Sequence, residues 1–146
     1  NMRGTWLPSK IMTPLMIGQQ GACVLNVSSM SAFTPLTRIP GYSGAKAAVS
    51  NFTQWLATYL ARSGVRVNAI APGFFMTEQN HALQFNPDGT PTPRCAHIVN
   101  GTPMRRYGEL KELIGAMLFL VDERAASFVT GVVLPVDGGY SAFSGV

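Results

Sequence analysis

Apolar residues follow two alternating rhythms along the chain. Short, nearly continuous apolar runs bounded by Gly, Ser or Pro are typical of strands buried on both faces of a parallel sheet, and they occur at residues 22–27, 65–71 and 132–136. Apolar residues spaced three and four apart predict helices over residues 2–20, 42–62 and 109–121. The alternation of helix and strand indicates an α/β fold, a doubly wound parallel sheet with right-handed crossovers.

Two further segments carry expectations of their own. In the first helix, an apolar face that we expect to be buried is formed by Trp6, Ile11, Leu15 and Met16. Residues 74–108 contain four prolines with Gly and Asn, and a connection of that length in a compact domain is usually a lid or binding loop.

Composition narrows the function classes. Of the 146 residues, 47% are hydrophobic and only 12% charged, about half the usual ~25%, so we expect a homo-oligomer or protein absent from this chain to cover apolar surface. The net charge of +4 comes from scattered basic residues, which argues against nucleic-acid binding.

No apolar stretch approaches 18 residues, so we expect no membrane span. Cys23 and Cys95 form no disulfide framework, which favours a cytoplasmic location. His81 and His97 lack partners at ligand spacing, so we expect no metal site.

A candidate catalytic pair stands at the start of the second helix. Tyr42 and Lys46 are four residues apart, hence one turn apart on one helix face, although a solvated helix face gives the same pattern. An ammonium beside a phenol favours the phenolate, which can exchange a proton with a substrate. Ser29 ends the first predicted strand, and Pro72-Gly73 ends the second. Ligands of open α/β sheets bind outside the carboxyl ends of the strands, so these features point to one crevice.

The text around these residues is similar to a known family. In order along the chain stand Asn26-Val27-Ser28-Ser29, Tyr42-Ser43-Gly44-Ala45-Lys46, residues 67–73 (VNAIAPG), Thr130-Gly131 and residues 136–139 (VDGG). This sequence resembles the short-chain dehydrogenase/reductases over essentially its whole length. The resemblance implies that residues 1–146 are the C-terminal catalytic part of one Rossmann-type domain. The N-terminal strands and the glycine-rich turn are absent from this sequence, which starts without Met and inside a predicted element.

The resemblance also implies roles for individual residues. Tyr42 matches the general acid/base, Ser29 the residue that hydrogen-bonds the substrate oxygen, and Lys46 the residue that binds the cofactor ribose and assists the tyrosine. Asn1 falls at the offset of an Asn that holds a water of the proton relay. The positions that match contacts to the cofactor, NAD or NADP, are Pro72, Gly73, Phe75 and Thr77. The thirteen-residue offset to Tyr42 favours Ser29 over Ser28, which we expect to be structural.

The implied reaction interconverts a carbonyl and a secondary alcohol. The long loop and the C-terminal tail resemble the D-mannonate oxidoreductase (fructuronate reductase) subgroup, which implies a sugar acid substrate. A carboxylate favours a guanidinium partner, and Arg94 and Arg38 are the candidates, although either can be an ordinary surface arginine. Arg106 and Glu112 resemble a structural pair that anchors the loop. Two alternatives stay open: another keto-sugar, polyol or gluconate-type reductase of the family, or an inactive half-domain.

Overall fold

The computed structural model describes residues 1–145, and of Gln79 its backbone only. Three parallel strands form the sheet in the order β1-β2-β3, and they are β1 (Cys23–Val27), β2 (Arg66–Pro72) and β3 (Val133–Val136). In the register, Cys23 lies opposite Arg66, and Pro72 lies opposite Val136. The α/β prediction is confirmed, and each strand lies within one residue of its expected bounds.

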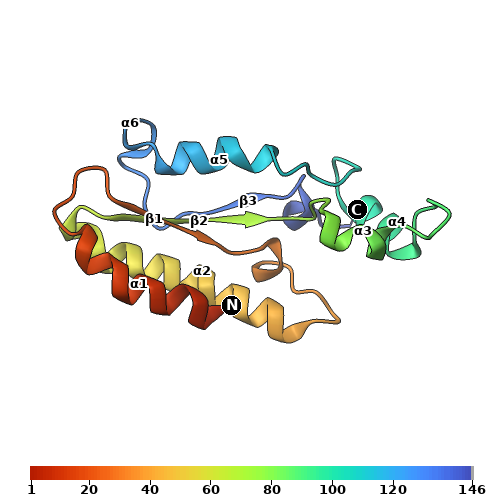
Figure 1. The fold of residues 1–146 in the computed structure, drawn as a ribbon, viewed down its shortest axis with the longest axis horizontal. Helices are drawn as coiled ribbons and strands as arrows, with labels where there is room; N and C mark the ends of the chain where they lie inside the picture. The colour runs from red at the N-terminus through yellow and green to blue at the C-terminus, as the bar shows by residue number, and fades with distance from the viewer. Residues whose placement is uncertain (146) are drawn as a thin grey trace.

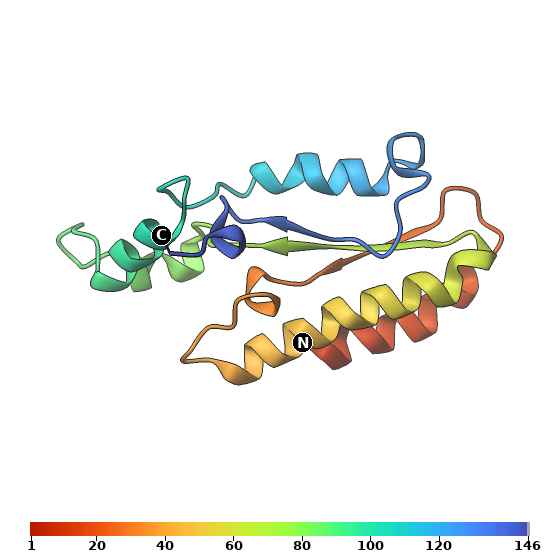
Figure 2. The ribbon, with the colours of Figure 1, turned by 180° about the vertical axis from the view of Figure 1, so that it is seen from behind.

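Helices cover both faces of the sheet (Figure 1). Helices α1 (Met2–Met16) and α2 (Pro40–Leu60) lie side by side on one face, and α5 (Glu112–Val121) with the short α6 (Glu123–Ala126) lies on the other. The view from behind shows the same three layers (Figure 2). Beyond the carboxyl ends of the strands lie α3 (Glu78–Gln84) and α4 (Pro93–Gly101), together with the C-terminal segment. The 3₁₀ turns are η1 (Met30–Ala32), η2 (Ala61–Ser63) and η3 (Tyr140–Ala142).

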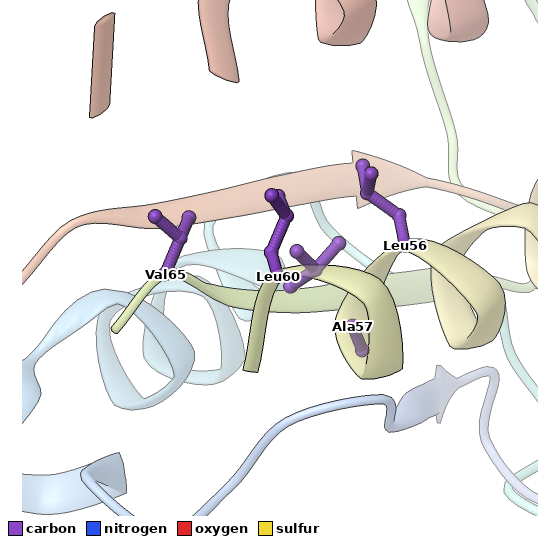
Figure 3. Packing of buried hydrophobic residues seen from close by; sticks show 5 residues of the cluster. Leu56, Ala57, Leu60 and Val65 are labelled. Carbon is purple, nitrogen blue, oxygen red and sulfur yellow. The ribbon is translucent and has the colours of Figure 1, made fainter. Parts of the chain in front are cut away.

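The core lies where α2 packs against β1 and β2. Its buried members come from the last turns of α2 and the start of β2, and they are Leu56, Ala57, Leu60, Val65 and Val67 (Figure 3). Burying a Leu or Val side chain contributes about 1.5–3 kcal/mol. Gly64, with φ of 75°, makes the left-handed turn that sends the chain from η2 back into β2. This core therefore fixes the direction of α2 relative to the strands.

The expected buried face of α1 is wrong within the described residues. Trp6, Ile11 and Leu15 are 44%, 59% and 69% exposed, and Met16 is only partly buried against the core. The buried side chains of α1 are instead Ser9 and Thr13. Their hydroxyls donate 2.8 Å hydrogen bonds to the carbonyls four residues earlier, so these small polar groups are satisfied within the helix itself. The apolar stripe of α1 is therefore largely exposed in the described structure.

Residues 74–108 are more ordered than the sequence predicted, because α3 and α4 lie within them. Both helices begin at a threonine whose hydroxyl accepts a backbone hydrogen bond, Thr77 from Asn80 and Thr92 from Cys95. Helix α2 starts at Pro40 rather than at residue 42, since proline suits the first helical position. Helix α5 starts at Glu112 rather than at residue 109, because a turn occupies the intervening residues.

A hollow of about 550 Å³ runs along the outer edge of β1. It lies between that strand and α1, and its lining also includes Lys46 of α2. Within the described residues, β1 pairs with β2 and with no strand on its other side. Among residues 1–145, β1 is therefore an edge strand with the hollow beside it.

Candidate active site

Tyr42 and Lys46 lie in the first turns of α2, at the carboxyl end of the sheet. The Lys46 Nζ lies 5.7 Å from the centroid of the Tyr42 ring. Tyr42 is 38% exposed. Lys46 is partly buried, and this burial lowers its pKa below the ordinary lysine value. The Lys46 Nζ donates a 2.7 Å hydrogen bond to the Val27 carbonyl, which ties the side chain to the end of β1.

The backbone of Lys46 is held by a second set of contacts. Its carbonyl accepts hydrogen bonds from the hydroxyls of Ser28 at 3.1 Å and Ser50 at 3.2 Å. The two hydroxyls lie 2.6 Å apart. Ser28 is buried and occupied by these contacts, in keeping with a structural role. These contacts of Ser28 and Ser50 with the Lys46 carbonyl hold the first turns of α2 against the end of β1.

Ser29 follows β1 directly and caps η1. Its backbone is extended, with φ of −166°, and the next residues turn back over its side chain. The Ser29 Oγ accepts hydrogen bonds from the Ser31 backbone N–H at 3.2 Å and from the Ser31 hydroxyl at 3.0 Å. Both serines are buried. Sequence reasoning missed Ser31, although serines two apart after a strand are a known local turn signal.

Asn1 lies at the same end of the molecule. It precedes the first residue of α1, its side chain makes no capping hydrogen bond, and it is exposed. Asn1, Val27 and Lys46 line the same hollow beside β1. The structure therefore brings the candidate water-holding asparagine and the candidate lysine to one cavity.

Pro72 and Gly73 end β2 in close contact with the segment that follows β3. The Gly73 N–H donates a 2.9 Å hydrogen bond to the Val136 carbonyl. A Cβ added at Gly73 would lie 2.6 Å from the Asp137 Cα, so only glycine fits here. The Asp137 carboxylate in turn accepts backbone hydrogen bonds from Gly139 and Ser141, each 2.9 Å long. These contacts fix the backbone at the carboxyl ends of β2 and β3, which we call the floor of the site.

Phe75 and Thr77 are joined by one asparagine. The Asn80 side chain donates to the Phe75 carbonyl at 2.8 Å and accepts from the Thr77 N–H at 3.1 Å. The Phe75 ring packs against Gly108, where an added Cβ would lie 2.5 Å from a ring carbon. The segment that enters α3 therefore has a fixed path from the end of β2.

The two candidate arginines form no hydrogen bond or ion pair with the residues of the candidate site described above. Arg38 and Arg94 are both exposed, and neither side chain forms a hydrogen bond or ion pair within residues 1–145. The Arg106–Glu112 pair is present and bidentate, with two N–O distances of 2.7 Å. These hydrogen bonds from Arg106, with a further one from the Glu109 N–H, lower the pKa of Glu112 to about 2.

A buried hydrogen bond also crosses residues 74–108. The Tyr107 hydroxyl donates to the Gln84 side-chain oxygen at 2.6 Å, and Gln84 is only 2% exposed. Burial raises the pKa of Tyr107 well above its ordinary range, so the phenol keeps its proton. This bond attaches the end of α3 to the strand-like segment that leads to α5.

Comparison with known proteins identifies the family. A family model described as enoyl-(acyl carrier protein) reductase matches residues 1–141. The chain belongs to the short-chain dehydrogenase/reductase family. An uncharacterized oxidoreductase of Haemophilus influenzae is 60% identical over 146 residues, which are 100% of this chain and 51% of that protein. The chain spans about half the length of the short-chain dehydrogenase/reductases that it matches.

Solved structures of the family have the same fold. One from Haemophilus influenzae, provisionally named a D-mannonate oxidoreductase, contains bound NAD; it has a TM-score of 0.94 and 60% identity, covering 98% of this chain and 51% of that one. Another from Agrobacterium tumefaciens, provisionally named a 2-deoxy-D-gluconate 3-dehydrogenase, contains bound NADP; it has a TM-score of 0.82 and 31% identity, covering 94% and 54%. The Rossmann-type fold expected from the sequence is thereby confirmed.

No cluster of three or more His, Cys, Asp or Glu side chains in residues 1–145 is arranged to hold a metal ion. None of the helices described here is long and apolar enough to cross a membrane.

Proposed function

We propose that the full-length protein, meaning this chain joined to the half that its relatives carry, is an NAD(P)-dependent oxidoreductase that interconverts a carbonyl and a secondary alcohol. The observation that carries the proposal is the placement of Tyr42 and Lys46 one turn apart, 5.7 Å from Nζ to ring centroid, beside the strand end that bears Ser29. Family membership and the nicotinamide cofactors bound in solved relatives support it.

The residues present fit a nicotinamide nucleotide. Lys46 has three N–H donors, of which one bonds to the Val27 carbonyl, so two are available for ribose hydroxyls. Pro72 and Gly73 offer a closely packed backbone without a side chain at Gly73, and Phe75 and Thr77 continue the same segment toward α3. When bound, the nicotinamide would give or take a hydride at the substrate carbon.

This chain's own residues would bind the substrate oxygen and exchange a proton with it. Ser29 donates a hydrogen bond to that oxygen, and Tyr42 transfers a proton to it during reduction or takes one during oxidation. The Lys46 ammonium stabilises the negative charge left on Tyr42. Asn1 would hold a water that passes a proton between Tyr42 and solvent, toward Tyr42 during reduction and away from it during oxidation. The carbonyl thus gains one hydride at carbon and one proton at oxygen, and the charges balance.

The substrate that we favour is a sugar acid of the D-fructuronate/D-mannonate type. The name given to the 60% identical structure supports this choice, and the exposed Arg94 and Arg38 are free to meet a carboxylate. A gluconate-type substrate is the competing choice, supported by the name of the 31% identical structure. Turnover of D-fructuronate against keto-gluconates and uncharged keto-sugars would separate the two.

We also propose that the full-length protein is a homo-oligomer. The outward apolar side chains of α1 and the exposed aromatic rings of α2, Trp55 and Tyr59, support a helical contact between copies. We further propose that residues 1–146, expressed alone, are an inactive half-domain. The open edge of β1 would favour aggregation of this isolated half. Light scattering of the full-length protein, and thermal unfolding and turnover of residues 1–146 alone, test these two statements.

The decisive experiment replaces Tyr42 by Phe in the full-length protein. Losing the proton donor should lower kcat by about 10²–10⁴ while cofactor binding, followed by fluorescence titration, stays intact. Tyr59→Phe is the matched control, since it removes the same hydroxyl from the same helix and keeps the aromatic ring of the proposed contact between copies. Near-normal turnover in Tyr42→Phe would remove the assignment.

A further inference from the structure

The hydroxyl of Ser29 has both of its acceptor positions filled. A serine hydroxyl carries one donor hydrogen and two acceptor lone pairs. The Ser29 Oγ receives the Ser31 backbone N–H at 3.2 Å and the Ser31 hydroxyl at 3.0 Å. What remains to Ser29 is its own hydrogen, which must point away from Ser31.

The local fold holds this arrangement in place. The extended backbone of Ser29 leads into η1, and the Ala32 N–H donates to the Ser29 carbonyl at 3.0 Å, which brings Ser31 back over the Ser29 side chain. Ser31 is 1% exposed and Ser29 is 7% exposed, so water competes poorly for these two bonds. A hydroxyl that accepts hydrogen bonds becomes a stronger donor, because bonds in a chain polarise one another.

We propose that Ser31 is a positioning residue that makes Ser29 an obligatory hydrogen-bond donor to the substrate oxygen. The inference rests on the proposed function, in which Ser29 donates to that oxygen, and adds Ser31 as the residue that fixes the direction of this hydrogen bond. Because Ser29 cannot accept a hydrogen bond, the hydrogen of a bound alcohol must point to the other partner, Tyr42. The two hydroxyls of the site therefore have separate tasks: Ser29 orients the oxygen by donation, and Tyr42 exchanges the proton. Ser31 touches neither substrate nor cofactor in this scheme, and no covalent bond to it forms or breaks.

The kinetic test uses four variants of the full-length protein: Ser31→Ala, Ser31→Thr, Ser29→Ala and the double variant Ser29→Ala/Ser31→Ala. Ser31→Ala keeps the N–H donor and loses the hydroxyl donor, so kcat should fall about fivefold with the cofactor KM unchanged. Ser31→Thr, which restores a hydroxyl, should regain most of the loss. In the Ser29→Ala background the same change should have no further effect, because Ser31 acts through Ser29.

The outcomes exclude a merely structural role for Ser31. Ser9→Ala is the matched control, since it removes a hydroxyl of similar burial from α1. A fall in kcat that is equal in both backgrounds, or the absence of any fall in the wild-type background, would overturn the proposal.

A neutron diffraction structure separates this inference from the proposed function. If the full-length protein reduces no keto-sugar, the proposed function fails, but the hydrogen positions still test Ser31. We expect a hydrogen on the Ser31 Oγ that points at the Ser29 Oγ, with the Ser29 hydrogen directed elsewhere. A Ser29 hydrogen that points at the Ser31 Oγ would refute the inference whatever the substrate.

Discussion

Replacing Gly73 by Ala tests how tightly the floor of the site is packed. Gly73 ends β2 with its N–H bonded to the Val136 carbonyl. Its φ is not positive, so alanine suits the backbone conformation, and space alone forbids the methyl group. The added carbon would lie 2.6 Å from both the Cα and the Cβ of Asp137, against 3.4–4 Å in ordinary van der Waals contact.

The cost of that methyl follows from what it meets. Two of the three nearest atoms are Asp137 backbone atoms, so no side-chain rotation relieves the contact. The carboxyl ends of β2 and β3 must separate instead, which strains the Gly73–Val136 bond and the turn that Asp137 caps. Overpacking of this kind costs about 1–3 kcal/mol, and we expect Gly73→Ala to fall in the upper part of that range because backbone must move.

Urea unfolding of the full-length protein measures this change as a lower midpoint with an unchanged slope. Gly115→Ala is the control, since Gly115 lies within α5 and an added Cβ there meets nothing within 4 Å. Alanine in an exposed helix interior should stabilise by about 0.5–1 kcal/mol, so the two glycine replacements should have opposite signs. A Gly73→Ala protein as stable as the wild type would refute the packing argument. Cofactor affinity should fall together with stability in Gly73→Ala and stay constant in Gly115→Ala.

Three other substitutions test the loop and its anchors. Arg94→Ala should raise KM for a keto-acid about 10- to 100-fold, the worth of a charge-assisted contact, and leave KM for an uncharged keto-sugar unchanged; Arg62→Ala at the opposite end of the sheet is its control, and equal effects on both substrates would contradict the carboxylate role. Tyr107→Phe should lower the free energy of unfolding by about 1–3 kcal/mol, because it leaves the buried oxygen of Gln84 without its donor, and an unchanged urea midpoint would argue against this. Glu112→Gln should flatten the acid arm of the stability curve: its folded-state pKa of about 2 lies below the ordinary 4.5, so the carboxylate's contribution is present above pH 4.5 and is lost as the pH falls to about 2. Unfolding free energies measured across that pH range check the last point, and identical slopes in the two proteins would refute it.

The strands could be predicted because their signal is strong in the sequence. A short apolar run between breakers has few other uses, and β2, which is buried along nearly its whole length, was located within one residue. The α1 face could not be predicted in the same way. Its spacing predicts an apolar stripe, but it does not say whether the partner of that stripe is α2, a missing half or another copy. The face of α1 that is buried, with Ser9 and Thr13, is therefore a result of tertiary packing that the apolar spacing does not predict.

Part of the candidate site could likewise be predicted from the sequence, and part could not. The closeness of Tyr42 and Lys46 follows from helical spacing, and the convergence of Ser29 and Gly73 on one sheet edge follows from parallel strands. The short helices α3 and α4 were missed because a helix of 7 or 9 residues gives a weak periodic signal. Thr77 and Thr92 are residues of a type that commonly caps a helix N-terminus, and Pro93 after Thr92 suits the first helical position. These two signals could have indicated the starts of α3 and α4. The Ser31 hydrogen bonds depend on the turn geometry of η1, which no periodicity encodes.

The order of the strands has a consequence for biosynthesis. In this sheet the spatial order β1-β2-β3 repeats the order along the chain. Each strand that leaves the ribosome can therefore dock on one synthesised just before it, without waiting for a distant segment. We expect nascent chains of the full-length protein to gain protease resistance stepwise, β1 before β2 and β2 before β3.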